Sequence, residues 1–319
     1  MTVYIMSSKH PIIAITGSAG SGTTTVRKIF EDIFRRKNTN ASYIHGNCFR
    51  KYPRIELENI FKQAERTGQT ISHFGPEVNL LDRLEGLFRE YSRNGSGCVR
   101  EYIETAQQAK THQLPIGVFS PWVELPSDSD LLLYEGQHGG CTQAGWSRRE
   151  LSESHNPFVI QQRMKSKEIE DTGVDIAKWV DLLIGIVPSI NLEWMQRIDR
   201  ACTITGCSPN QATDVILRRM DDYVRYMTPQ FSITDINFQR IPIVDTSSPF
   251  GFDEIPSEDE CMLVIRFRDP KKYDIVNYIN QFPNAYLSRP NTLVIRNSYM
   301  THAIDTICSP LIDQLVRQD

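Results

Sequence analysis

Hydrophobic and polar positions along this chain follow two periods in turn, and the alternation predicts strands interleaved with helices. Short apolar runs predict strands at 12–15, 41–45, 131–134, 182–187, 261–267 and 292–296. Apolar residues spaced three and four apart predict helices near 26–34, 55–66, 77–92, 192–203, 209–227, 271–281 and 302–316. Strands that alternate with helices favour a mostly parallel sheet covered on both faces. We therefore expect an α/β fold with a three-layer, doubly wound sheet.

Residues 139–178 break this pattern, because they are polar and charged and show no clear period. We interpret them as a surface insertion between two core strands. The chain shows no internal repeat. The expected organisation is therefore a single domain over residues 9–319 that carries the insertion 139–178.

Composition narrows the class of protein further. The chain has 319 residues, 40% of them hydrophobic, and a formal net charge of −4, which gives no general reason to expect nucleic acid or an anionic membrane as a partner. No apolar run approaches the roughly 20 residues of a membrane span. Seven scattered cysteines without a Cys-x-x-Cys pair suit reduced thiols better than a disulfide frame or a zinc site. The amino-terminal residues lack a signal-peptide pattern, so we expect a cytoplasmic protein.

The first predicted strand runs into a glycine-rich turn and then a helix, which is the order that a phosphate-binding loop requires. The residues that would bind a nucleotide triphosphate are Gly17, Ser18, Gly20, Ser21, Gly22, Thr23, Thr24 and Thr25. Glycines let several N–H groups converge on one anion, and the helix N-terminus adds its dipole. Thr24 stands where a hydroxyl ligates Mg²⁺. The usual Walker lysine is absent, since Thr23 takes its place, and a plain strand–helix turn is the alternative.

Charged residues follow two other predicted strands. Glu135 comes after a buried run, where the acid of a second Walker motif holds Mg²⁺; a solvated turn carboxylate is the alternative. Arg50 and Arg54 follow the second strand, and their planar guanidinium groups suit a second phosphate, unless they simply form a hydrated surface. Arg197 and Arg200 on the helix near 192–203 add positive charge. The residues thus predict a nucleotide site beside a second anionic ligand.

With these motifs in view, the chain resembles the phosphoribulokinase family, in its shorter proteobacterial type. The matching stretches are Lys9-His-Pro-Ile-Ile13, Gly17-Ser-Ala-Gly-Ser-Gly-Thr-Thr-Thr25, Tyr134-Glu-Gly136 with His138-Gly139, Asn191-Leu-Glu-Trp194, Thr213-Asp-Val-Ile-Leu-Arg-Arg-Met220, Pro229-Gln-Phe231, Ile236-Asn-Phe-Gln-Arg240, Val244-Asp-Thr-Ser247, Val264-Ile-Arg-Phe-Arg268 and Pro310-Leu. They extend from residue 9 to the C-terminus, so the resemblance covers nearly the whole chain.

The resemblance implies a P-loop kinase-like fold, a homo-oligomer, and transfer of the γ-phosphoryl group of ATP, bound with Mg²⁺, to the primary hydroxyl of ribulose 5-phosphate in the Calvin cycle. It implies catalytic roles for Glu135, Arg197, Arg200 and the position of Asn47, and metal ligation by Thr24 and Glu135. Arg50 and Arg54 would bind the sugar phosphate. Arg36, Arg218, Arg266 and Arg289 match the cations of a site for NADH, as an effector and not as a redox cofactor.

The chain departs from the family pattern on the side of the phosphoryl acceptor. The family motif Gly-Asp-x-Phe-His reads Gly46-Asn47-Cys48-Phe49-Arg50 here, so a carboxamide replaces the expected base; losing a positioned base costs about 10²- to 10⁴-fold in rate. Ala201 replaces an acid, Thr205 replaces a cation, and Glu104 stands where the family shows a histidine. Asp199 lies about 200° from position 201 around the helix axis and is a poor substitute.

Three functions remain open at this point. The first is a kinase of this family, with ribulose 5-phosphate as the default acceptor and activity that the departures weaken. The second is a catalytically degenerate nucleotide-binding regulator or scaffold of the same fold, which the changes at positions 47 and 201 favour. The third, a nucleoside kinase with a related loop, is disfavoured by the missing lysine.

Overall fold

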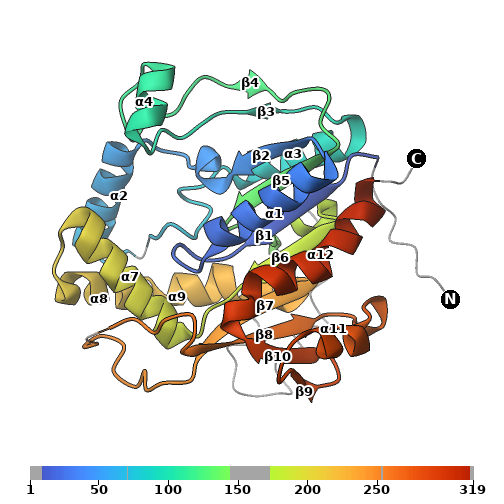
Figure 1. Ribbon diagram of the computed structural model, residues 1–319. Helices are drawn as coiled ribbons and strands as arrows, with labels where there is room; N and C mark the ends of the chain where they lie inside the picture. The colour runs from blue at the N-terminus through green and yellow to red at the C-terminus, as the bar shows by residue number, and fades with distance from the viewer. Residues whose placement is uncertain (1–8, 70, 144–172, 253, 317–319) are drawn as a thin grey trace, which may run out of the picture.

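One eight-stranded sheet forms the centre of the protein (Figure 1). The computed structural model describes residues 9–69, 71–143, 173–252 and 254–316. The strand order is β2-β5-β1-β6-β7-β8-β10-β9. The strands are β1 Ile12–Thr16, β2 Ala41–His45, β5 Leu131–Gly136, β6 Leu182–Ile186, β7 Ile236–Pro242, β8 Cys261–Phe267, β9 Tyr286–Arg289 and β10 Thr292–Arg296. Strands β2 to β7 in this order are parallel, and the last three pair antiparallel, which confirms a mostly parallel sheet.

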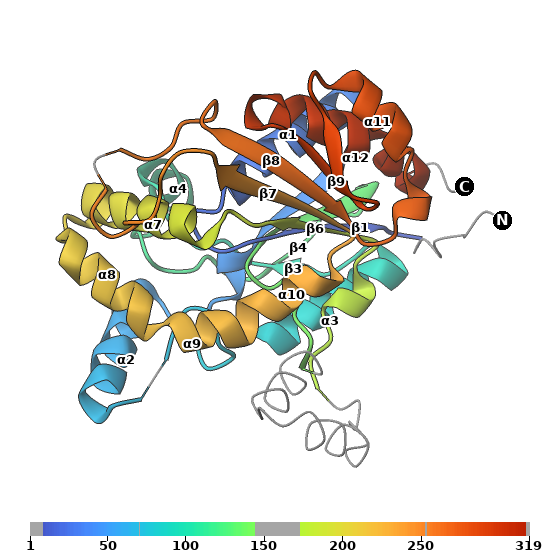
Figure 2. The same ribbon diagram turned by 90° about the horizontal axis from the view of Figure 1, so that it is seen from below.

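Helices cover both faces of this sheet, as the view from below shows (Figure 2). Helices α1 Thr23–Lys37, α11 Ile275–Gln281 and α12 Met300–Val316 lie on one face. The other face carries α3 Leu81–Asn94, α9 Met220–Asp222, the π-helical turn Tyr223–Met227 and α10 Thr228–Ile233. Each face has its own apolar core, one around Phe30 and one around Phe88. The three-layer prediction is therefore confirmed.

Three further helices gather where the parallel strands end (Figures 1 and 2). They are α2 Arg54–Thr67, α7 Ile190–Thr205 and α8 Pro209–Arg218. Ligands of open α/β sheets bind at the carboxyl ends of the strands, so this end positions the candidate site.

An excursion over residues 98–124 lies beyond the β2 edge of the sheet (Figure 1). Its two ends pair with each other as β3 Cys98–Val99 and β4 Val123–Glu124, and it carries the short helix α4 Ala106–His112. Within it, the Ile103 N–H donates to the Val118 carbonyl at 2.9 Å and the Gly117 N–H donates to the Ile103 carbonyl at 2.7 Å. These bonds hold the backbone on one side of residue 104 in place.

Several predicted boundaries differ from the observed ones. The helix expected over 209–227 is interrupted at Arg219, and those expected from 77 and 271 begin at Leu81 and Ile275. The sequence did not predict β7, β9 or α4. Single-turn 3₁₀ helices occupy Gly46–Phe49, Ala177–Trp179, Pro270–Lys272 and Asn297–Tyr299. Most of the predicted insertion 139–178 lies outside the described residues, so it stays a prediction, as does the single domain over 9–319.

Helices long and apolar enough to cross a membrane do not occur in the described ranges.

Candidate functional site

A cavity of about 500 Å³ opens at the carboxyl ends of β1, β2 and β5. The phosphate loop forms one wall, the turn after β2 forms another, and α7 closes a third side. The predicted site residues that line it are Gly17, Ser18, Gly20, Gly22, Thr23, Thr24, Asn47, Arg50, Glu135 and Arg200. The structure thus brings together the predicted nucleotide side and part of the predicted acceptor side.

The loop between β1 and α1 is folded as an anion cradle. Gly20 and Gly22 have φ angles of 91° and 101°, in the left-handed region that favours glycine. The Ser21 N–H donates to the Ser18 carbonyl at 3.1 Å, which closes the turn before α1 begins. The loop therefore points its amides and the α1 N-terminus into the cavity, as a phosphate site requires.

Buried hydroxyls provide an independent test of whether the cradle suits a phosphate. Ser18 and Ser21 are 1% and 5% exposed; the Ser18 hydroxyl faces the buried carboxylate of Glu193, whereas the Ser21 hydroxyl has no hydrogen-bond partner in the part of the chain that the structure describes. Buried polar groups are normally paired, so the Ser21 hydroxyl fits an anionic oxygen that reaches the loop. Thr25 differs from them because its side chain is exposed on the first turn of α1.

Glu135 joins the loop to the sheet. The register of β5 places it opposite Ile15 on β1 and His45 on β2. Its Oε1 accepts hydrogen bonds from Thr23 Oγ1 at 2.9 Å and Thr24 Oγ1 at 2.7 Å. Carboxylate and hydroxyl oxygens suit Mg²⁺, which keeps phosphate and water oxygens as further ligands. Thr24 and Glu135 thus fit the predicted role of holding the ion.

The second oxygen of Glu135 has partners that the sequence did not predict. Its Oε2 accepts from the Tyr43 hydroxyl at 2.8 Å and lies 3.1 Å from Arg27 Nε, and the Arg27 guanidinium stacks 4.6 Å above the Tyr43 ring. Partial burial and the nearby carboxylate raise the pKa of Tyr43, so the hydroxyl remains a donor. Two features of the sequence could have indicated these partners of Glu135. Arg27 lies one helical turn after Thr23, and Tyr43 lies two residues before His45 on β2, a spacing that puts both side chains on one face of a strand.

Asn47 and Arg50 line the cavity opposite the loop. The Asn47 N–H donates to His45 Nδ1 at 3.2 Å, and its side-chain amide donates to Glu104 Oε1. The Arg50 guanidinium stacks 5.0 Å above the Tyr102 ring of the excursion. Glu104 also lines the cavity, at the position where the resemblance implies a histidine near the substrate.

Three other residues of the predicted acceptor side lie outside the cavity lining. Arg54 Nε is 3.0 Å from Glu58 Oε1 at the start of α2. Arg197 NH1 is 3.6 Å from the buried Glu193, and a side chain at Gly20 would meet Arg197 at 3.7 Å, so Arg197 lies against the loop at Gly20. Ala201 packs between α7 and α8. The substrate role of Arg54 and the catalytic role of Arg197 stay predictions.

The four predicted effector arginines have partners on different elements. Arg36 NH2 is 2.8 Å from Asp305 on α12, and Arg218 pairs with Glu65 on α2. Arg266 NH2 donates to the Phe231 carbonyl at 2.7 Å, and Arg289 is exposed on β9. Their role at an NADH site stays a prediction.

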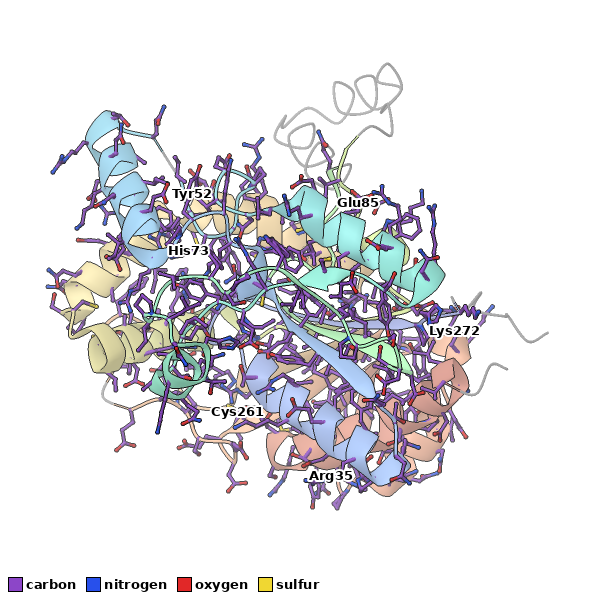
Figure 3. The ribbon with its side chains drawn as sticks, turned by 90° about the horizontal axis from the view of Figure 1, so that it is seen from above. Arg35, Tyr52, His73, Glu85, Cys261 and Lys272 are labelled. Atoms are coloured by element: carbon purple, nitrogen blue, oxygen red, sulfur yellow. The ribbon has the colours of Figure 1, made fainter. Side chains whose placement is uncertain are left out.

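Two histidines form part of the cavity lining from the α3 face. His73, labelled in Figure 3, lies beside α2, with its ring 4.7 Å from that of Phe61. His138 Nε2 lies 3.1 Å from the Phe74 carbonyl, and burial lowers the pKa of His138 to about 4. Both side chains are therefore neutral in the folded state at neutral pH.

The buried His138 should make the free energy of unfolding fall in mild acid. The unfolded chain binds a proton near pH 6.5, whereas the folded chain resists it until about pH 4, so stability is lost as the pH falls through this window. The loss from this group amounts to about 3 kcal/mol at most. Urea unfolding across the window should show a shallower loss for His138→Gln. An unchanged slope in His138→Gln, or an equal change in the exposed control His302→Gln, would contradict the assignment.

The comparisons with known proteins agree with this geometry. The model of the phosphoribulokinase / uridine kinase family matches residues 12–151 and 168–247. The phosphoribulokinase of Nitrobacter vulgaris is 42% identical over 98% of this chain and 99% of its own. The chromosomal phosphoribulokinase of Cupriavidus necator is also 42% identical, over 98% of each chain.

A solved structure extends the match to the fold. The phosphoribulokinase from Rhodobacter spheroides superposes with a TM-score of 0.81 at 39% identity, over 98% of this chain and 99% of that one. The phosphate loop, the carboxylate at the end of β5 and the sheet topology therefore have one common explanation, which is that the chain belongs to the phosphoribulokinase / uridine kinase family.

Proposed function

We propose that the protein is an ATP-dependent kinase that transfers the γ-phosphoryl group to the primary hydroxyl of ribulose 5-phosphate. The observation that carries the proposal is the composition of one cavity. It combines a phosphate loop and the Thr24–Glu135 pair with the cations Arg50 and Arg200. A triphosphate and a phosphorylated sugar both need such positive groups. The full-length similarity to phosphoribulokinases supports the choice of acceptor.

The roles of the residues follow from their positions. The loop amides and the α1 N-terminus would bind the phosphates of ATP, with the Ser21 hydroxyl as an additional donor. Thr24 and Glu135 would hold Mg²⁺, which neutralises charge on the phosphates when it is bound. Arg200 and Arg50 would stabilise the charge of the transferring group and of the sugar phosphate. Phosphoryl transfer depends mainly on such positioning and electrostatics.

A nucleotide-binding regulator or scaffold is the second candidate. It is favoured by the amide of Asn47, which cannot accept a proton, and by Ala201, which packs against apolar side chains. Such a protein would keep the phosphate loop and lose the transfer reaction. Binding of ATP without turnover would identify it.

The test is a coupled assay of ADP release with MgATP and ribulose 5-phosphate, alongside calorimetry of ATP binding. We expect sugar-dependent ADP release and formation of a bisphosphorylated product by mass spectrometry. Ribose 5-phosphate and uridine are matched acceptor controls, the second for the nucleoside kinase alternative. ATP binding with no release for any acceptor would favour the regulator, and absence of ATP binding would contradict both candidates.

Three finer features belong to the same proposal. We infer a homo-oligomeric, cytoplasmic enzyme whose rate responds to NADH through Arg36, Arg218, Arg266 and Arg289. Light scattering of the purified protein measures the assembly, and NADH added to the coupled assay measures the response. An unchanged rate at saturating NADH would remove the effector role.

A further inference from the structure

The carboxylate of Glu104 lies at the acceptor side of the cavity, next to the residue where a base is missing. Glu104 is part of the excursion, and Asn47 is in the 3₁₀ turn after β2, so 57 positions of sequence separate them. The Asn47 side-chain amide donates a hydrogen bond to Glu104 Oε1, and both residues line the cavity together with the phosphate loop. The amide thus holds a carboxylate at the side of the cavity where the phosphoryl acceptor is proposed to bind.

The chemistry requires a proton acceptor in this space. A hydroxyl that attacks a phosphorus atom must lose its proton, and a carboxamide cannot take it. The carboxylates that line the cavity within the described ranges are Glu104 and Glu135. Glu135 already accepts from Thr23, Thr24 and Tyr43 and contacts Arg27, so both of its oxygens are engaged.

The histidines around the cavity are poorer candidates. His45 Nδ1 accepts the Asn47 N–H, so its proton lies on Nε2 and that nitrogen cannot accept another. His138 Nε2 is engaged with the Phe74 carbonyl. His73 Nδ1 is fully buried against α2. Glu104 is exposed, and one of its oxygens is free of the bond to Asn47 in the described structure.

The backbone around Glu104 is fixed by hydrogen bonds, as the backbone of a catalytic residue should be. Its neighbour Ile103 is fully buried and bonded on both sides to residues 117 and 118. The Glu104 N–H donates to Gln108 Oε1 at 3.0 Å, and Thr105 caps α4 in a capping box with Gln108. The backbone is therefore fixed on both sides of residue 104. This positions the carboxylate and leaves its second oxygen, Oε2, outside the bond to Asn47.

We propose that Glu104 is the general base of the reaction and that Asn47 is the residue that positions it. The inference rests on the proposed kinase function. The acceptor hydroxyl oxygen forms a bond to the γ-phosphorus, and the bond from that phosphorus to the bridging oxygen breaks. The bridging oxygen leaves with the electron pair as part of ADP, and the hydroxyl proton moves to Glu104. Position 47 thus carries no base because the carboxylate comes from the excursion.

The test compares Glu104→Gln with the matched control Glu101→Gln. Glu101 is an exposed carboxylate of the same excursion, paired with His112 at 3.1 Å and outside the cavity lining. Glu104→Gln should lower kcat by about 10²- to 10⁴-fold, whereas ATP affinity by calorimetry stays at the wild-type value. Glu101→Gln should leave kcat within about twofold of wild type, since it removes only a surface ion pair.

Two rescue measurements separate a base from a merely structural carboxylate. Formate added to Glu104→Ala should raise its rate, because a small carboxylate can enter the space left by the side chain. Adding Asn47→Asp to Glu104→Gln should restore most of kcat, because a carboxylate then returns to the same side of the cavity. A structural role of Glu104 predicts neither result.

The outcomes distinguish this inference from the function on which it rests. Wild-type protein without sugar-dependent turnover would contradict the proposed function and this inference together. Wild-type turnover with a Glu104→Gln variant within about threefold of it would contradict the base assignment and leave the kinase function intact. A loss of rate in Glu104→Gln that neither formate in Glu104→Ala nor Asn47→Asp reverses would also overturn the assignment.

Discussion

Glu135→Gln should lower kcat by about 10²- to 10³-fold. Among the described residues, the hydrogen bonds and the ion pair to the Glu135 side chain come from the donors Thr23, Thr24, Tyr43 and Arg27. A glutamine side chain keeps one acceptor oxygen and turns an amide donor toward the remaining donors. It also removes the negative charge that would hold Mg²⁺ in the proposed site. Unfolding should become easier by about 1–3 kcal/mol, because buried polar groups lose their partners.

The coupled assay at saturating MgATP measures the rate, and urea unfolding measures the stability. Glu31→Gln is the matched control, because Glu31 also pairs with Arg27, at 2.5 Å, but lies on the exposed side of α1. It should change stability by less than about 0.5 kcal/mol and leave kcat unchanged. Equal effects of the two substitutions would show that the ion pair with Arg27, and not the contacts to the loop, explains the loss.

Gly17→Ala should weaken ATP binding by about 10- to 100-fold through steric conflict alone. An added methyl group would lie 2.8 Å from the Ile186 carbonyl and 2.5 Å from Ser21 Oγ. The carbonyl belongs to β6 in the centre of the sheet and cannot move cheaply, so the loop must shift instead. Such overpacking costs about 1–3 kcal/mol, and each 1.4 kcal/mol corresponds to a factor of ten in affinity.

Calorimetry with ATP measures this effect, and Gly86→Ala controls for a methyl group added elsewhere. Gly86 lies within α3, and an added methyl group there meets no atom within 4 Å. Gly86→Ala should stabilise the protein by about 0.5–1 kcal/mol, because alanine favours a helix interior, and should leave ATP affinity unchanged. Wild-type affinity in Gly17→Ala would mean that the loop tolerates displacement.

Local sequence was sufficient to predict most of the residues that line the loop side of the cavity. The phosphate loop is contiguous, and its glycines and hydroxyls are required by backbone geometry that the order strand, turn, helix already implies. Glu135 was predicted for a similar reason, because a polar residue directly after a buried strand lies at the edge of the sheet.

The acceptor side depends on contacts between distant segments, and the residues alone predicted less of it. Asn47 and Glu104 meet only because the excursion folds back against the turn after β2. Tyr43 reaches Glu135 across 92 positions of sequence. The hydrophobic pattern does not indicate contacts between segments so far apart in the sequence. The residues and the resemblance therefore predicted position 47 only as the place where a base is missing.

Two of the elements that the pattern missed, β9 and α4, have no buried side. β9 is exposed along its whole length, and α4 buries none of its residues, so neither carries an apolar period. The capping box at Thr105 and Gln108 was the available signal for α4. The interruption of the helix at Arg219 could not be predicted from the pattern, because the apolar spacing continues across it.

The pairing of β3 with β4 has a practical consequence for engineering. Just outside this pair, the Leu125 N–H donates to the Gly97 carbonyl at 2.8 Å. The two ends of the excursion therefore join the rest of the chain side by side. Arg100 fastens it to the rest of the chain by donating to the carbonyls of Cys48 and Arg50 at 3.0 and 2.6 Å. A chimaera that receives this segment from a relative, with its arginine retained, should keep its affinity for ATP, because the phosphate loop lies outside the exchanged segment.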